Sequence, residues 1–322
     1  MSLLKIASVG TSGIMNVMQE AIALNDDTQC VLVYSRSRQR GKDYAASVGV
    51  KRSTDSFDEL LGDKEANTVY IASPNVCHKD QAVAALKHKK HVILEKPSSL
   101  TEADSRLIFD TARENGVFCF EAITTVYMPS YLEMKRSLKD LGKFRSARIV
   151  FGRYSSKYDD YLAGKNPNIM NPDLGGGALN DMGIYCVHTA VDLFGAPMSV
   201  KYDAEFGPNG VDLEGIVTLG YPDLKCVLET AKCRDLDSGC YLECENGYAR
   251  SAGLLNEFRS CTISVGGEEK TVSSPDINRM VYELESFVKA IKDNDTELFE
   301  RRAAQSIIAA SILEKGHASS LL

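Results

Sequence analysis

The chain of 322 residues is too long for one ordinary core and is expected to form two domains. Its 44% hydrophobic and 25% charged residues are typical of a globular protein and exclude a disordered or fibrous one. The net charge of −7 argues against a general nucleic-acid binder. The first residues show no signal-peptide pattern and no apolar run is long enough to cross a bilayer, so we expect a cytoplasmic protein that binds neither membrane nor nucleic acid.

The nine cysteines are scattered from Cys30 to Cys261 without a C-x-x-C pair, a usage typical of the reducing cytoplasm. Cys240 and Cys244 are four residues apart in an expected strand. Because no histidine lies nearby in the sequence, we interpret them as packed thiols and expect no metal site.

In residues 1–121, short β-branched segments alternate with segments whose apolar residues have helical spacing. We expect strands at 5–9, 30–34, 68–72, 91–94 and 117–121, and helices at 14–24, 39–47, 79–88 and 102–115. This alternation predicts a parallel sheet with helices on both faces, an α/β domain of the Rossmann type.

After Glu121 the pattern changes to strands joined by short turns. It predicts a second, α+β domain at 122–322 with a large, mostly antiparallel open sheet. We expect helices at 130–141, 178–194, 278–292 and 300–317, strands at 146–154 and within 200–272, and one long loop at 155–177.

The first expected strand ends in a glycine turn, Val9-Gly10-Thr11-Ser12-Gly13-Ile14-Met15. Compared with the dinucleotide motif G-x-G-x-x-G/A, Gly10 matches the first glycine, whereas Ser12 and Met15 replace the second and third. Backbone N–H groups at the start of the following helix would face a cofactor pyrophosphate. The motif is degenerate, and a plain strand-to-helix turn would look similar.

The second expected strand ends in Tyr34-Ser35-Arg36-Ser37-Arg38-Gln39-Arg40. An NAD-specific site usually carries Asp or Glu here, to bind the ribose 2′-hydroxyl. This chain has no carboxylate at the strand end, and Ser35 and Arg36 can bind a 2′-phosphate instead. The pattern predicts NADP as the cofactor, with NAD as the alternative. For Arg38 and Arg40 we keep the simpler interpretation of a solvated helix start.

Two later strands end in Ser73-Pro74-Asn75, followed by His78, and in Glu95-Lys96-Pro97. Ligands of open α/β sheets bind at the carboxyl ends of the strands, where both segments lie. A lysine that ends a buried strand and precedes a proline is held rigidly. We therefore take Lys96 as a candidate catalytic residue.

These motifs, together with Glu121-Ala122 and Gly175-Gly176-Gly177-x-x-x-Asp181, resemble the Gfo/Idh/MocA oxidoreductases over essentially the whole chain. The resemblance implies that Lys96 lies beside the nicotinamide and the reacting oxygen, and that the bond before Pro97 is cis. It also implies that the cofactor is bound by the motif residues, which are Gly10, Thr11, Ser12, Gly13, Ile14, Ser35, Arg36, Ser73, Pro74, Asn75, His78, Glu95, Lys96 and Glu121.

The helix after the three glycines carries Asp181, Tyr185 and His188, whose spacing places them on one face. Tyr185 stands where many family members have histidine, and so resembles the branch with dihydrodiol dehydrogenases, some xylose dehydrogenases and glucose-fructose oxidoreductase. The alternative is a buried tyrosine capped by Asp181. We interpret His188 as a core residue.

Oxidation of an alcohol needs a group that takes the hydroxyl proton. Lys96 could lower the pKa of Tyr185 for this purpose, or could move the proton itself while Asp181 fixes its charge and position. The sequence leaves both assignments open. We take Lys96 and Tyr185 as the proton-handling pair, with Asp181 orienting them.

Residues 123–129 depart from the dihydrodiol branch, which commonly shows Trp and Arg there, whereas this chain has Ile-Thr-Thr-Val-Tyr-Met-Pro and no Trp anywhere. We expect this segment to border the substrate pocket, so the substrate of that branch does not transfer. In the long loop, Asn168 and Asn171 either bind substrate hydroxyls or only form turns.

The leading hypothesis is an NADP-preferring oxidoreductase that transfers a hydride between the nicotinamide and the hydroxyl or carbonyl carbon of a sugar, a sugar derivative or a cyclic diol. The alternating polarity of residues 224–231 is compatible with a sheet face that forms a homodimer, alone or within a dimer of dimers. The alternatives are a catalytically silent NAD(P)-binding regulator, or a bilin or imine reductase on the same scaffold. Retention of Lys96, Asp181 and Tyr185 favours the enzyme, and the Asn-rich loop favours a polyhydroxylated substrate.

Overall fold

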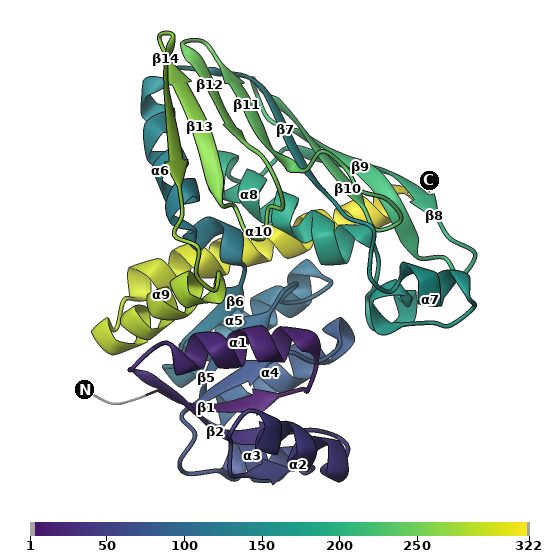
Figure 1. Ribbon diagram of the computed structural model, residues 1–322, viewed down its shortest axis with the longest axis vertical. Helices are drawn as coiled ribbons and strands as arrows, with labels where there is room; N and C mark the ends of the chain where they lie inside the picture. Colours follow the sequence, from purple (N-terminus) through teal and green to yellow (C-terminus); the bar gives the residue numbers. More distant parts are fainter. Residues whose placement is uncertain (1–3, 321–322) are drawn as a thin grey trace. The chain divides into compact units, whose positions relative to one another are not determined.

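The computed structural model describes residues 4–320 and divides into two compact units (Figure 1). Unit 1 contains the chain up to Ser99, Ala103–Ala122 and Ile277–Ser306. Unit 2 contains Leu100–Glu102, Ile123–Asp276 and the chain from Ile307. None of the helices within residues 4–320 combines the length and the apolar content that crossing a membrane requires.

Unit 1 is built on a six-stranded sheet in which all neighbouring strands are parallel, as the strand–helix alternation predicts. In spatial order the strands are β3 (Ser53–Thr54), β2 (Thr28–Tyr34), β1 (Leu4–Val9), β4 (Thr68–Ile71), β5 (His91–Glu95) and β6 (Cys119–Ala122). The helices that follow its strands are α1 (Gly13–Ala23), α2 (Arg38–Ser47), α3 (Phe57–Gly62), the short η1 (Asn75–Cys77), α4 (His78–Lys87) and α5 (Glu102–Asn115). β4 and β6 are buried at every residue, which is typical of strands covered on both faces.

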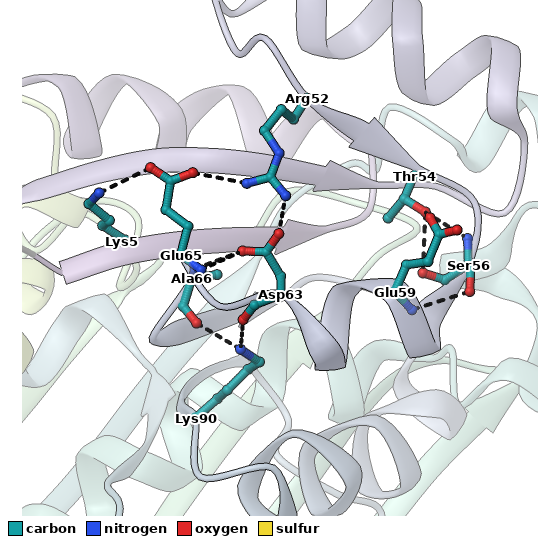
Figure 2. A network of polar contacts seen from close by, with 9 residues as sticks. All are labelled: Lys5, Arg52, Thr54, Ser56, Glu59, Asp63, Glu65, Ala66 and Lys90. Atoms are coloured by element: carbon teal, nitrogen blue, oxygen red, sulfur yellow. Dashed lines mark hydrogen bonds and ion pairs between the residues drawn. The ribbon is translucent and has the colours of Figure 1, made fainter.

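The edge strand β3 and the helix α3 are not among the elements that hydrophobic spacing predicts. β3 is a strand of two residues that pairs with Val33 and Tyr34 of β2. The short helix α3 is capped by the Ser56 hydroxyl, which accepts from the Glu59 N–H at 3.2 Å. The Glu59 carboxylate in turn accepts from the Thr54 hydroxyl at 2.5 Å, which ties α3 to the end of β3 (Figure 2). Such local polar contacts leave no periodic signal in the sequence.

A second polar network holds the segment between α3 and β4 (Figure 2). The Arg52 guanidinium pairs with Asp63 and, at 2.9 Å, with Glu65. The buried Lys90 ammonium donates to the backbone carbonyls of Asp63 and Ala66, each at 2.7 Å. These bonds satisfy carbonyl groups just past the end of α3, where no helical partner exists.

The helix α9 (Met280–Asp293) and the first part of α10 (Thr296–Ser320) belong to unit 1, so the predicted assignment of all of 122–322 to the second domain is wrong for 277–306. Phe287 of α9 stacks on Phe120 of β6 at 4.8 Å, and Phe299 of α10 meets Phe118 edge-on at 5.5 Å. The apolar faces of these helices cover the end of the parallel sheet. Chain order alone does not show which sheet a terminal helix covers.

Unit 2 contains an eight-stranded sheet in which only β7 and β10 pair in parallel, confirming the mostly antiparallel prediction. In spatial order the strands are β14 (Glu268–Ser273), β13 (Ser260–Val265), β12 (Gly247–Ser251), β11 (Gly239–Cys244), β7 (Phe144–Gly152), β10 (Lys225–Ala231), β9 (Asp212–Gly220) and β8 (Ser199–Phe206). In Figure 1 the teal β7 lies between the later, green strands β11 and β10.

The other elements of unit 2 show where the sequence pattern was too coarse. They are η2 (Thr124–Tyr127), α6 (Pro129–Ser137), η3 (Leu138–Asp140), α7 (Tyr158–Leu162), η4 (Asn168–Met170), η5 (Pro172–Leu174), the π-helical turn η6 (Leu179–Gly183) and α8 (Ile184–Phe194). The expected loop at 155–177 therefore contains a short helix and two 3-10 turns. The expected single helix at 178–194 begins with a π turn.

The two faces of the large sheet differ in burial. Along β10, Cys226 and Leu228 are buried, whereas Lys225 is exposed and Glu229 is half-buried. On the covered side, every residue of α8 from Ile184 to Val191 is buried. The alternation predicted for residues 224–231 is confirmed, and it defines a covered face and an outer face of the sheet.

Candidate active site

The glycine turn after β1 depends on Gly10. Its φ is +118°, and a Cβ at this position would lie 2.8 Å from the carbonyl oxygen of Ala72. Both facts exclude any side chain here. Met15, in place of the third glycine of the motif, lies on the buried face of α1 and is fully buried. The turn therefore keeps the one glycine that its geometry requires.

The start of α1 has the features of an anion site. The N-cap residue, Ser12, makes no side-chain capping hydrogen bond, and the first turn has no acidic residue. Thr11, Ser12, Gly13 and Ile14 all keep exposed surface. The backbone N–H groups and the positive end of the helix thus fit a pyrophosphate, as the motif predicts.

At the end of β2, Ser35 is buried and its N–H donates to the carbonyl of Thr54 at 3.1 Å. The next residue, Arg36, is exposed and forms no ion pair with any residue in the range 4–320. The structure thus places an uncompensated cation at the strand end. A cation at this position can pair with a phosphate group.

The turn that carries Lys96 is held by hydrogen bonds to the two residues that follow it. The peptide bond between Lys96 and Pro97 is cis, which confirms the implication of the family resemblance. The carbonyl of Pro97 contacts Nδ1 of His78 at 2.8 Å, and the N–H of Ser98 donates to Oε1 of Glu121 at 2.8 Å. These two contacts fix the backbone next to Lys96. Lys96 itself is half-buried directly after β5, so part of the residue is exposed to solvent.

His78 was predicted to bind the cofactor, but it has no exposed surface. Its second ring nitrogen, Nε2, contacts the carbonyl of Ser73 at 2.9 Å. Burial lowers the pKa of His78, while the two carbonyl contacts oppose this shift. The structure therefore corrects a direct role to an indirect one: His78 joins the ends of β4 and β5.

Of the other residues predicted to bind the cofactor, some are partly exposed and some are buried. Ser73, Pro74 and Asn75 are partly exposed at the end of β4, where a cofactor can reach them. Glu95 and Glu121 are buried, and their carboxylates bind the Tyr70 hydroxyl at 2.6 Å and the Ser98 N–H, respectively. Burial raises the pKa of Glu95.

Sequence reasoning missed a third buried glutamate in unit 1, Glu283 on α9. Its side chain is fully buried, and neither carboxyl oxygen has a hydrogen-bond partner among residues 4–320. Burial, followed by repulsion from Glu95, raises its pKa well above the ordinary value, and Arg279 opposes this shift. A glutamate in the apolar stripe of α9, between Met280 and Phe287, was the signal that could have found it.

In unit 2, the two predicted residues lie at the start of the helix that follows the three glycines. Asp181 is part of the π turn η6, and Tyr185 lies in the first turn of α8. Tyr185 is 8% exposed and meets Phe151 of β7 edge-on at 5.4 Å. His188 is fully buried, which confirms its interpretation as a core residue. π turns are frequent at functional sites.

Two polar side chains from β9 and β10, and a third directly after β10, hold this π turn. Asp212 accepts from the N–H of Leu179 at 2.7 Å, and the hydroxyl of Thr230 donates to the carbonyl of Ala178 at 3.1 Å. The third is Lys232, which directly follows β10 and whose ammonium lies 2.5 Å from Oδ2 of Asp181. Lys232 was not predicted, because no local motif marks a lysine at the end of a strand in another part of the chain.

Residues 123–129, which were expected to border the pocket, and the long loop both form hydrogen bonds within unit 2. The hydroxyls of Thr124 and Thr125 donate to the carbonyls of Asn256 and Leu255, each at 2.7 Å. The side chain of Asn171 accepts from the N–H of Asp173 at 3.0 Å, which confirms the turn interpretation for this residue. Asn168 is exposed, and its hydroxyl-binding role stays a prediction.

No metal centre emerges in residues 4–320: they contain no group of three or more His, Cys, Asp or Glu side chains that could hold an ion. All nine cysteines are free, and Cys240 and Cys244 are buried, which confirms their interpretation as packed thiols.

The predicted cofactor positions lie at the carboxyl ends of β1, β2, β4, β5 and β6 in unit 1. The other two predicted catalytic residues, Asp181 and Tyr185, lie in unit 2.

Comparison with known proteins identifies both parts of the chain. Residues 4–123 match a family described as "Oxidoreductase family, NAD-binding Rossmann fold", and residues 131–250 match the GFO/IDH/MocA C-terminal domain. The chain is 33% identical to scyllo-inositol 2-dehydrogenase (NADP(+)) IolU of Bacillus subtilis, over 97% of this chain and 96% of that protein. It is 27% identical to trans-1,2-dihydrobenzene-1,2-diol dehydrogenase of Mus musculus, over 90% and 88% of the two chains.

Solved structures show the same fold. A 3-ketoreductase from Actinomadura kijaniata, KijD10, in complex with NADP and TDP-benzene superposes with a TM-score of 0.87 at 19% identity, covering 99% of this chain and 98% of that one. Levoglucosan dehydrogenase in complex with NADH and levoglucosan gives 0.87 at 17% identity, with the same coverage. The chain therefore belongs to the Gfo/Idh/MocA family and is an NAD(P)-dependent oxidoreductase.

Proposed function

We propose that this protein is an NADP-preferring oxidoreductase that transfers a hydride between the nicotinamide and a carbon bearing a hydroxyl or carbonyl group. The observation that carries the proposal is the Lys96 turn, held by the contacts of His78 and Glu121, at the same edge of the sheet as the uncapped start of α1. The names of two relatives, an inositol dehydrogenase and a dihydrobenzenediol dehydrogenase, support a cyclic substrate with neighbouring hydroxyls, such as a sugar, a sugar derivative or a cyclic diol.

In this proposal the bound cofactor accepts or gives the hydride, and the protein moves the hydroxyl proton. In the oxidative direction the carbon loses a hydride while the hydroxyl loses its proton to Tyr185 or to Lys96. The positive charge of Lys96 favours the phenolate of Tyr185 in the first assignment and lets Lys96 act as the base in the second. Asp181 orients the proton-handling group in both.

The first test is cofactor affinity. We expect the purified protein to bind NADPH more tightly than NADH, and Arg36→Ala to weaken NADPH binding about 10- to 100-fold because a charge-assisted contact is lost. NADH affinity should change little. Fluorescence titration measures both values, and Lys87→Ala, which removes an exposed cation from α4, is the matched control. Tighter binding of NADH than NADPH by the unaltered protein would contradict the proposed preference.

The substrate class is tested next by following nicotinamide absorbance across a panel of sugars, inositols and cyclic diols. The proposal expects turnover of at least one such compound. A chain that binds NADPH but turns over none of them in either direction is not the proposed dehydrogenase. The same panel includes aromatic ketones and imines, so that turnover confined to these would move the assignment to another substrate class.

We also propose a homodimer, alone or within a dimer of dimers, formed through the outer face of the large sheet. Ile216 of β9 is 45% exposed and lies directly opposite Glu229 of β10, so both side chains point to this face. Light scattering should therefore show a mass of two or four chains, and Ile216→Asp should shift it toward the monomer. Ile277→Asp alters a similarly exposed side chain of unit 1, at 42%, and serves as the control. A monomer at micromolar concentration would remove this proposal.

A further inference from the structure

The lysine that follows β10 has an unusual environment. The side chain of Lys232 is 0% exposed, and its ammonium contacts Oδ2 of Asp181 at 2.5 Å. An ammonium has three N–H donors, and Asp181 is the one acceptor that residues 4–320 provide for it. Asp181 is 26% exposed, so the carboxylate lies between the buried cation and solvent.

Stability of the fold does not explain this arrangement. Burying a charged lysine raises the free energy of the folded state, because the ammonium loses its hydration. The attraction to a single carboxylate offsets only part of this desolvation free energy. An apolar side chain of the same length would fill the space next to β10 without the penalty. The backbone of Lys232 already completes the local structure: its N–H donates to the carbonyl of Leu213 at 2.8 Å, and its carbonyl accepts from Ser155 at 2.9 Å.

The charge of Lys232 acts at one place, the π turn that carries Asp181. Asp212 and Thr230 fix the backbone of this turn at Leu179 and Ala178, and neither touches the Asp181 carboxylate in the contacts above. Lys232, directly after β10, contacts that carboxylate itself. It completes a set of three groups at the ends of β9 and β10 that hold the segment leading to Tyr185.

We propose that Lys232 is a positioning residue, whose ammonium keeps Asp181 ionised and oriented on the π turn so that the carboxylate can act on the proton-handling group. The assignment rests on the proposed function. Other titratable groups around this turn are Asp212 on β9, Tyr202 on β8, Tyr185 on α8 and His317 on α10, which contacts Asn180 at 2.9 Å. None of them replaces the positive charge that Lys232 brings to Asp181 at neutral pH.

The activity test compares Lys232→Met, Lys232→Arg and Lys225→Met. Lys232→Met keeps the volume and removes the charge, so we expect kcat to fall about 100-fold, the effect of a misplaced catalytic group. NADPH affinity should stay unchanged, because the cofactor positions lie in unit 1. The acidic limb of the pH profile should move to higher pH, and Lys232→Arg should recover part of kcat. Lys225→Met, on the exposed end of β10, should behave as the unaltered protein.

Thermal unfolding of every variant is measured first, and Lys232→Gln, which retains a donor, replaces the methionine variant if the latter does not fold. A folded Lys232→Met or Lys232→Gln protein that keeps kcat within about threefold and the original pH profile overturns the proposal. So does a variant that loses kcat without any change in the pH profile, since that is the result of a purely structural role.

A second readout separates this proposal from the proposed function. Carbon-13 NMR of labelled aspartate carboxyls, with Asp181→Asn for the assignment, follows the titration of Asp181 directly. We expect Asp181 to titrate at higher pH in Lys232→Met than in the unaltered protein. An identical titration in the two proteins overturns the role of Lys232. If the unaltered protein turns over no polyol, the proposed function fails while this measurement still decides the charge coupling.

Discussion

Replacing Lys96 by Met is expected to lower kcat about 1000-fold, the largest effect on turnover of any single substitution in this chain. The variant removes the charge and the exchangeable proton but keeps most of the length of the side chain. The turn itself should survive, because the contacts of His78 with Pro97 and of Glu121 with Ser98 do not involve the Lys96 ammonium. The loss should therefore appear in the chemical step and not in folding.

Single-turnover measurement with saturating NADPH or NADP separates the chemical step from cofactor binding. Lys87→Met, on the exposed last turn of α4, is the control for a general loss of positive charge. We expect Lys96→Arg to restore a small part of kcat if the charge matters most, and none if Lys96 carries the proton. A Lys96→Met protein with turnover close to that of the unaltered protein would disprove the mechanism in both of its forms.

The largest effect on stability is expected from Glu283→Met, which should raise the free energy of unfolding by about 1–3 kcal/mol at pH 8. The Glu283 carboxyl is fully buried without a hydrogen bond among residues 4–320, and burial raises its pKa in the folded state. In the unfolded chain the same group ionises near its ordinary pKa. As the pH rises above that value, the unfolded state is favoured and the folded state loses stability.

The gain from Glu283→Met should consequently shrink as the pH falls through the ordinary pKa of the carboxyl, 4.5, because the group then becomes protonated in the unfolded chain as well as in the folded one. Urea unfolding at pH 4, 5, 6, 7 and 8 measures this dependence. Glu285→Met, two residues further along α9 and exposed, is the matched control and should show little pH dependence. A constant difference between the unaltered protein and Glu283→Met across this range would show that the buried carboxyl does not titrate as described.

Sequence reasoning worked best where a feature repeats along the chain or is confined to a few neighbouring residues. The period of the apolar residues located β1, β2, β4, β5 and β6 to within two residues. It failed for β3 and α3, because elements of two and six residues are too short to show a period. It also assigned α9 to the wrong unit, since helical spacing shows that a face is apolar and not which partner covers it.

The residues of the candidate site also divide into those that a local sequence pattern predicts and those that depend on distant parts of the chain. The positions of Gly10, Lys96 and Tyr185 were predictable because a tight turn, a strand end and a helix start each require a recognisable local pattern. His78 was predicted at the right place with the wrong role, since its burial depends on how α4 packs. Glu283 and Lys232 were missed, because each acquires its importance from a residue far away in the sequence.

The amino-acid sequence by itself determined the alternating sheet domain, the antiparallel second sheet and the candidate residues at the carboxyl ends of the strands. These follow from local periodicity and from turn chemistry, which act over a few residues. The tertiary structure alone decided that 277–306 covers the parallel sheet, that the Glu283 carboxyl is buried near Glu95, and that Lys232 pairs with Asp181. The energy of a buried charge is set by everything that surrounds it, and those surroundings exist only once the chain has folded.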